Sequence, residues 1–455
     1  MRKIVVIVAL ILFASICFTT TPISVYAIDE HIPSEGEIQQ GINSIVDSQN
    51  EGNLQMIVSG YGIPYTILSS CKWGSVGFKR NTHGGASLIY YDHESMTYGY
   101  LTDQSVATCD NNNPGWIDNS FGGLSPIINE KEIIVIKAGD TTTDYWEGTG
   151  SYFLKMSPDG SNKRIFQLEM TESIEVNSGI VYDGKDFYFV MNKYNGKDDF
   201  PIASYLCKTD IETGKYTVLS EQIETNTCIS IVGTFQNKLI VMEMSLSEKD
   251  KTEPSNTLIY RYYLYDCISQ NYIFNDMQWA QGELTIVFDG GYAYYCTQSN
   301  PHLMRINIIT GEKEEKTFKV SEENAKFILL SACLDNHIIF YGFDQEKKNP
   351  TPFCYDVNTE EIKQLQLTYH DSDGVEFLTT ICSECEDYFL VMCGASYVLT
   401  EDQLADGTKY EYEAREEQYG LISKEDYWDS IDNIIPFTLA DSPMVNDNYR
   451  SKYGC

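Results

Sequence analysis

The sequence predicts an all-β fold, a seven-bladed β-propeller with four-stranded antiparallel blades, over residues 54–440. The first observation is a hairpin from Ser204 to Ser220, in which aromatic or branched residues alternate on both sides of a polar turn. The second is that this layout occurs seven times, and each copy from the second onward follows another pair of short strands. A four-stranded unit repeated every ~40–65 residues is typical of propellers. The alternative is a sandwich of unrelated hairpins, for which one internal order through seven copies is not expected.

The hairpin turn has residues suited to its backbone. Gly214 is expected in the left-handed conformation, because it has no Cβ to clash, and Asp210 is expected to cap the turn with its carboxylate. The other six hairpins cover residues 88–101, 152–168, 258–274, 303–318, 353–367 and 420–437. Candidates for the first strands of the first blade are residues 56–60 and 65–70. The last blade has four candidate strands of its own, which leaves open how the propeller closes.

Two of these hairpins carry a family resemblance. Residues 153–168, with Asp-Gly-Ser at 159–161, resemble the hairpin of TolB-like propellers. Residues 205–219 resemble the blades of secreted Gram-positive propellers that contain a domain of unknown function. The resemblance covers residues 55–440 and implies the fold, but it transfers no catalytic residue. Similar chains often have a segment with Cys and His after the first hairpin, whereas only Cys109 is present here.

Residues 1–27 have the pattern of a secretory signal peptide. Arg2 and Lys3 precede an apolar run, and cleavage is expected after Ala27. The run is about 15 residues long, which is shorter than the ~20 residues of a spanning helix. We therefore expect a secreted or cell-envelope protein without a membrane span after cleavage. A lipid anchor on Cys17 is the weaker alternative, because Ile16 stands where a small residue is required.

The two ends of the mature chain flank the propeller. Residues 28–53 are expected to form a leader with a short amphipathic helix, since a capping box at Ser34 to Glu37 precedes apolar residues at helical spacing. Residues 441–455 are expected to be a loose C-terminal tail.

The composition limits the partners. The formal net charge of −34 repels nucleic acid and anionic lipid, and it favours solubility, cationic partners or divalent ions. We expect a monomer. Among thirteen cysteines, most lie between apolar neighbours and are expected to be free and buried, although disulfides are an open alternative in a secreted chain. Those nearer to loops are the better candidates for pairing: Cys71, Cys109, Cys228 and Cys455. Cys382 and Cys385 form a C-x-x-C in a hairpin, where no helix terminus activates a thiol.

Motifs for catalysis and cofactor binding are lacking in the sequence. The six histidines have no metal-ligand spacing, and no nucleophile or phosphate-loop motif is present. No cofactor is predicted. The segment from Asp371 to Glu376 is a weak calcium candidate, because it lacks a full loop of oxygen ligands.

Connection lengths give the strongest functional signal. The connections between the second and third strands of a blade are long: residues 138–150, 192–203, 245–257, 344–352 and 395–418. In a propeller they lie on the same face as the connections between blades, of which residues 103–125 are a long example. Long loops on a rigid scaffold commonly bind ligands. The candidate binding residues are the aromatic side chains Trp116, Tyr145 and Trp146. The alternative for each is packing within its own loop.

The leading hypothesis is therefore a secreted, non-catalytic propeller that binds a protein, peptide or glycan through its long-loop face. The first alternative is a carbohydrate-active enzyme, a glycosidase or lyase with axial carboxylates. A second alternative is a structural spacer in the cell envelope.

Overall fold

The computed structural model is a seven-bladed β-propeller built from antiparallel four-stranded blades, as predicted. It describes residues 54–58, 68–80, 85–103, 113–117, 124–137, 152–167, 174–176, 179–193, 201–213, 215–222, 227–246, 258–272, 277–280, 284–297, 300–318, 327–343, 351–403 and 409–455. The predicted signal peptide, the leader and Cys17 lie outside these residues. The blades divide into two compact units, one within Glu224–Lys363 and one formed by Gln55–Ile223 with Gln364–Cys455.

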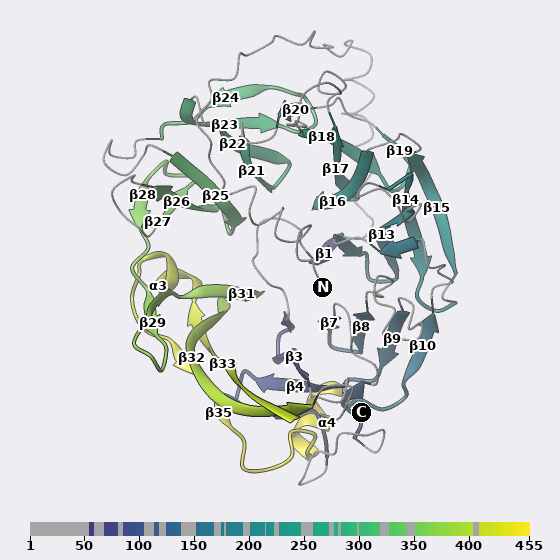
Figure 1. Ribbon diagram of the computed structural model, residues 1–455, viewed down its shortest axis with the longest axis vertical. Helices are drawn as coiled ribbons and strands as arrows, with labels where there is room; N and C mark the ends of the chain where they lie inside the picture. The colour runs from purple at the N-terminus through teal and green to yellow at the C-terminus, as the bar shows by residue number, and fades with distance from the viewer. Residues whose placement is uncertain are drawn as a thin grey trace. The chain divides into compact units, whose positions relative to one another are not determined.

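The larger unit contains blades 1, 2, 3 and 7 (Figure 1). Blade 1 consists of β2 (Ser69–Ser70), β3 (Gly74–Arg80), β4 (Ala86–Asp92) and β5 (Thr97–Tyr100). Blade 2 consists of β7 (Leu124–Ile128), β8 (Ile133–Lys137), β9 (Tyr152–Met156) and β10 (Arg164–Gln167). Blade 3 consists of β12 (Ile180–Tyr182), β13 (Asp186–Lys193), β14 (Ala203–Asp210) and β15 (Tyr216–Gln222). Blade 7 consists of β31 (Thr380–Cys385), β32 (Tyr388–Gln403), β33 (Lys409–Ser423) and β34 (Ile435–Pro436).

The smaller unit contains blades 4, 5 and 6. Blade 4 consists of β16 (Thr227–Phe235), β17 (Lys238–Leu246), β18 (Leu258–Asp266) and β19 (Asn271–Tyr272). Blade 5 consists of β21 (Leu284–Asp289), β22 (Tyr292–Thr297), β23 (Asn300–Asn307) and β24 (Lys313–Glu315). Blade 6 consists of β25 (Phe327–Leu334), β26 (His337–Phe343), β27 (Thr351–Asp356) and β28 (Ile362–Gln364).

Short strands extend several blades. They are β1 (Gln55–Val58) on β12, β6 (Trp116–Ile117) on β4, β11 (Ile174–Val176) on β13 and β20 (Met277–Ala280) on β18. The predicted start of blade 1 within residues 65–70 is confirmed by β2. The other candidate, residues 56–60, is wrong in its described part, because residues 56–58 belong to β1, which pairs along the open edge of β12 in blade 3.

One turn geometry joins the third and fourth strands in five blades. The side-chain oxygen of the last residue of the third strand accepts a hydrogen bond from the backbone N–H two residues later; these residues are Asp92, Asp210, Asp266, Asn307 and Asp356. Four residues after them the described backbone is left-handed, with φ of 53° to 74° at Met96, Gln270, Gly311 and Glu360. The capping role predicted for Asp210 is confirmed, and Gly214 lies outside the described residues.

Blade cores are apolar and pack against the next blade within each unit. In the larger unit, blade 7 meets blade 1 through Tyr91, Leu390, Tyr419 and Phe437. Helix α3 (Lys424–Trp428) covers blade 7, with Trp428 at 5.3 Å from the Phe389 ring. Because aromatic and branched residues alternate along each strand, one face of each sheet meets the neighbouring blade.

The C-terminal segment is packed on blade 1, so the prediction of a loose tail is wrong. Strand β35 (Thr438–Leu439) pairs in parallel with β5, and helix α4 (Asp447–Tyr453) follows. Tyr449 and Tyr453 are buried, and their rings make edge contacts with Tyr90 at 4.9 and 6.1 Å. This segment joins the last blade to the first, which answers the question of closure that the sequence left open.

Candidate functional site

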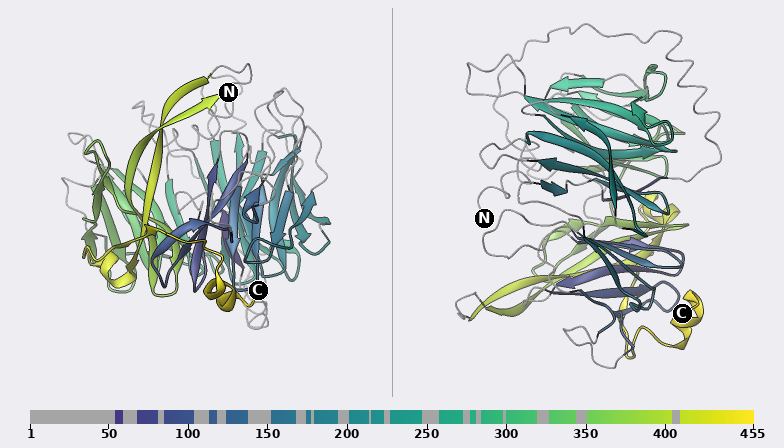
Figure 2. Two further views of the ribbon diagram at one scale, coloured as in Figure 1. Left: turned by 90° about the horizontal axis from the view of Figure 1, so that it is seen from below. Right: turned by 90° about the vertical axis from the view of Figure 1, so that its right-hand side faces the viewer.

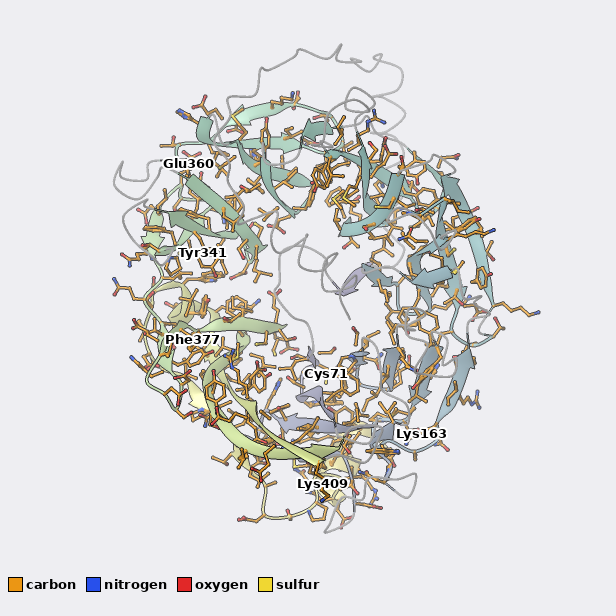
Figure 3. All side chains as sticks on the ribbon, viewed as in Figure 1. Cys71, Lys163, Tyr341, Glu360, Phe377 and Lys409 are labelled. Carbon is orange, nitrogen blue, oxygen red and sulfur yellow. The ribbon has the colours of Figure 1, made fainter. Side chains whose placement is uncertain are left out.

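Trp116 does not present the exposed ring predicted for a binding residue. It lies in β6, pairs with Ser87 of β4, and retains 5% exposure. A Cβ on Gly85 would overlap its ring at 1.9 Å, so the indole occupies the space above this glycine. Lys163, which is labelled in Figure 3, donates a hydrogen bond of 2.6 Å to the carbonyl oxygen of Trp116. Trp116 therefore packs within its own blade, whereas Tyr145 and Trp146 lie outside the described residues.

The long connections are only partly described. Most of residues 138–150, 192–203, 245–257 and 344–352 lies outside the described chain. Residues 395–418 are described at both ends and were expected to form a loop, but that expectation is wrong. They continue β32 and β33 as a regular antiparallel ladder, from Gly394 opposite Gln418 to Gln403 opposite Lys409. We call residues 394–403 and 409–418 the arm.

The arm extends blade 7 because its sequence keeps strand periodicity after the neighbouring strands have ended. β31 pairs with β32 only as far as Met392, and β34 pairs with β33 only at Gly420 and Leu421. A bulge between Met392 and Gly394 separates the blade from the arm. Bulges bend a strand and increase its twist. Figure 2 shows β32 and β33 continuing beyond the other strands of their blade.

The base of the arm is held on one face by Arg415. Its side chain donates a hydrogen bond of 2.9 Å to the Tyr369 hydroxyl and lies 5.2 Å from the centroid of the Phe377 ring. Tyr369 and Phe377 stack on each other in the small hairpin of β29 (Thr368–His370) and β30 (Glu376–Leu378). In Figure 3, Phe377 marks the base of the arm and Lys409 its far end. The cation–π contact fixes the position of the guanidinium at the start of the arm.

Two further contacts hold the same region. The Ser372 backbone N–H donates to the Ala395 carbonyl at 3.1 Å, and the Tyr397 N–H donates to the Ser372 hydroxyl at 3.3 Å. On the opposite face, Lys79 pairs with Glu416 at 2.8 Å, and this hydrogen bond raises the pKa of Lys79. An isolated two-stranded hairpin is marginally stable in water, so these contacts stabilise the arm where it leaves the blade.

Beyond its base the arm exposes apolar side chains beside acidic ones. Leu399 is 64% exposed and Tyr397 is 38% exposed. Leu399 lies opposite Glu413, and Glu411 lies two residues from Glu413 on the same face of β33. The sequence of the arm has six acidic and two basic residues, which gives a formal charge of −4. The acidic residues are Glu401, Asp402, Glu411, Glu413, Glu416 and Glu417, and the basic residues are Lys409 and Arg415. An exposed apolar group inside a charged border is typical of a protein-binding surface.

The other sequence candidates have structural roles in the described chain. Asp371 Oδ1 accepts hydrogen bonds from the N–H groups of Asp373 and Val375, so this carboxylate caps a turn. Cys382 and Cys385 are buried between blades 7 and 1, and burial raises the pKa of their thiols to about 12 and about 11. Eleven cysteines are described and all are free thiols, including three of the four candidates for pairing, Cys71, Cys228 and Cys455. The fourth candidate, Cys109, lies outside the described residues.

The first strands of the blades, which lie nearest the axis of a propeller, have two acidic residues within the described chain. Asp289 ends β21 and accepts a contact of 3.7 Å from the Cys333 thiol. Glu384 lies in β31 and pairs with Lys424. The two belong to different units, and neither unit brings a pair of described first-strand carboxylates together. No group of three metal-ligating side chains occurs among the described residues.

The fold defines the class of protein, a seven-bladed β-propeller, and comparisons add little to it. No protein-family model and no curated protein matches the chain. Among solved structures, a prolyl endopeptidase has a TM-score of 0.42 at 10% identity over 82% of this chain, which spans 47% of the peptidase. The oligogalacturonate lyase of Vibrio parahaemolyticus has a TM-score of 0.42 at 12% identity, over 75% of this chain and 94% of the lyase. TolB of Acinetobacter baumannii has a TM-score of 0.33 at 12% identity, over 79% of this chain and 78% of TolB. With TM-scores below 0.5 and identities of 10–12%, these likenesses assign neither a family nor an activity to the chain.

Proposed function

We propose that the protein is a secreted or cell-envelope binding protein, without catalytic activity, that holds a protein or peptide partner through the arm. The observation that carries this proposal is a two-stranded extension that is fixed at its base and exposes Leu399 and Tyr397 beyond it. Surfaces that bind proteins combine an apolar anchor with a polar border. An aliphatic anchor of this kind favours a polypeptide over a sugar ring.

The cellular location belongs to the same proposal. It is supported by the signal-peptide pattern of residues 1–27 and by the acidic charge of the whole chain. Neither described helix is long enough to cross a bilayer. N-terminal sequencing of the mature protein from the culture medium or cell surface should begin at Ile28, and a protein that retains Met1 would contradict secretion with cleavage.

Membership of a TolB-like class of propellers is also a proposal. It is supported by the Asp-Gly-Ser turn of blade 2, which forms as the motif suggests. Asp159 accepts hydrogen bonds from both the N–H and the hydroxyl of Ser161, and Gly160 has a φ of 80°. The alternative of a carbohydrate-active enzyme has no comparable support, because each unit contains one described first-strand carboxylate, Asp289 in one and Glu384 in the other.

Site-specific photocrosslinking tests the binding role. A benzoylphenylalanine residue in place of Leu399 is compared with the same residue in place of Ile165, which is 65% exposed on the outer strand of blade 2, against 64% for Leu399. Both proteins are irradiated with intact cells of the source organism. A discrete adduct at position 399 that is absent at position 165 is expected. Equal labelling at both positions, or no adduct at position 399, would overturn the proposal.

A further inference from the structure

We infer that the partner contributes a cationic, extended segment that adds to the outer edge of β33 as a new strand. This inference rests on the proposed function and specifies the chemistry of the partner. It is carried by an unpaired strand edge, by the acidic side chains beside it, and by the contacts that fix the arm.

The unpaired edge is the first step. β33 has β32 on one side along its whole length, but on the other side β34 reaches only Gly420 and Leu421. Along residues 410–418, no other described strand pairs with this outer edge. Such an edge presents backbone N–H and C=O groups to solvent and can accept an extended peptide by strand addition.

The side chains along this edge determine the charge of the segment. Glu411 and Glu413 lie two residues apart on one face of β33 and are both exposed. An added strand would place side chains at i and i+2 directly beside them, and opposite charges at such cross-strand positions attract. Arg415, the next residue on this face, is already engaged by Tyr369 and Phe377. The favoured segment therefore has two basic residues separated by one residue.

The same charges disfavour other occupants. A second copy of this chain would bring the arm's glutamates against each other, in a protein with a formal charge of −34. Nucleic acid and anionic lipid are repelled for the same reason. A basic peptide meets both requirements of the edge, because its backbone supplies hydrogen bonds and its side chains neutralise Glu411 and Glu413.

The rigidity of the arm supports binding without a large ordering cost. Arg415 holds one face and the pair of Lys79 with Glu416 holds the other, so the strand direction is set before a partner arrives. Preorganised edges lose less conformational entropy on binding than mobile loops do.

Peptide binding tests the inference directly. The probe is a dye-labelled decapeptide of alternating lysine and valine, and binding to the full mature protein is followed by fluorescence anisotropy at physiological ionic strength, where the Debye length is about 8 Å. Two comparison peptides are used: one with glutamate in place of lysine, and one in which the amide nitrogens of a single strand edge are methylated. Methylation keeps the charge but removes the hydrogen bonds of an added strand.

Two protein variants with the same change in charge are compared. Glu411→Lys with Glu413→Lys alters the arm, and Glu312→Lys with Glu361→Lys alters exposed turns of blades 5 and 6. The arm variant should weaken binding of the lysine peptide by about tenfold, and the control variant by about twofold or less, since remote charges are screened. Circular dichroism checks that both variants fold.

The outcomes separate the inference from the proposed function. Binding of the methylated peptide as tight as that of its parent would overturn strand addition. Equal loss in both protein variants, or equal binding of the glutamate peptide, would overturn the cationic specificity. If the photocrosslink at position 399 persists in either case, the arm still binds a protein, and only the chemistry assigned to the partner is wrong.

Discussion

Acidification should destabilise the protein through His93, at the contact between blade 1 and the C-terminal segment. The ring nitrogen Nε2 lies 2.7 Å from the Ser75 hydroxyl, which in turn lies 2.7 Å from the Ser70 hydroxyl. The Phe437 ring is 6.1 Å away. The pKa of His93 is lowered from its ordinary value of 6.5 to about 4, chiefly by burial; the charge of Asp92 opposes this lowering and the charge of Lys452 contributes to it.

The carboxylate next to His93 is already engaged. Asp92 Oδ1 accepts hydrogen bonds from the backbone N–H of Glu94 and from Lys452 Nζ at 2.9 and 3.0 Å. Lys452 also pairs with Glu94 at 2.7 Å. A proton on His93 would therefore place a second positive charge beside Lys452 in a buried position, which is costly.

The magnitude follows from the two pKa values. Above about pH 6.5 the imidazole is neutral in both the folded and the unfolded chain, so His93 leaves stability independent of pH. Between pH 6.5 and about 4 the unfolded chain binds a proton that the folded chain does not, and stability falls. With these values the loss is about 2 kcal/mol between pH 7.5 and pH 5, and about 3 kcal/mol once both forms are protonated.

Urea denaturation at pH 7.5 and pH 5 measures this loss, with His93→Gln as the reference. The free energy of unfolding of the wild type should fall by about 2 kcal/mol more than that of the variant, because carboxylates titrate in both proteins. Histidine NMR signals of the folded protein, assigned by the same variant, should show a His93 pKa near 4. A His93 pKa near 6.5, or equal pH dependence in the two proteins, would refute the reasoning.

Three further predictions concern the C-terminal helix, the thiols and one turn. Tyr449→Ala removes a buried aromatic contact between α4 and blade 1, so the free energy of unfolding measured by urea denaturation should fall by ~3–5 kcal/mol. A fall below ~1 kcal/mol would show that the helix does not stabilise blade 1. A thiol reagent should label exposed Cys455 in the folded protein but buried Cys382 only after unfolding, and mass spectrometry of peptides measures both reactions. Rapid labelling of Cys382 in the folded protein would contradict its burial. Gln270 has a left-handed backbone with φ of 56°, and Gln270→Gly should relieve the steric strain of this conformation. The free energy of unfolding should rise by ~0.5–1 kcal/mol in the same urea assay, and no rise would show that the turn is unstrained.

Strand order was predictable because each blade repeats a local pattern. Asp210 and Asn307 end their third strands in the same capped turn, although the residues around them differ. The alternation of apolar residues and the polar turn are both local, so they can be read without knowing what the blade packs against. The position of residues 56–60 was not predictable in this way, because β1 pairs with β12, more than a hundred residues further along the chain.

The C-terminal helix shows a second limit of the sequence pattern. Residues 441–455 contain few apolar residues, and in isolation they suggest a tail. Their burial depends on Tyr90 and Trp73 of blade 1, whose rings form a surface for Tyr453. Contacts between residues more than three hundred positions apart determine the outcome, and a single sequence read by itself contains no signal for them.

The arm lies in one of the long connections that the sequence singled out, but its strand structure was not predicted. The long insertion in blade 7 was visible, and its alternation of tyrosine and glutamate from Lys409 to Ala414, after Asp406-Gly407, is a hairpin signal that could have indicated strands. Trp116 was chosen because large aromatic residues often bind ligands, yet they are also the residues that gain most from burial.

A propeller blade needs strands only long enough to bury its faces, so extra strand length requires another explanation. The second and third strands of other blades have five to nine residues, as β8 and β17 show, whereas β32 and β33 have 16 and 15. Each strand has ten additional residues, and most of those with described side chains are exposed, Leu399 among them. Arg415 and Lys79 hold these residues at the base. Structure that costs conformational entropy without adding to a core is expected where a partner completes the packing. The departure from the repeat, more than any single residue type, therefore marks the surface where binding should be sought.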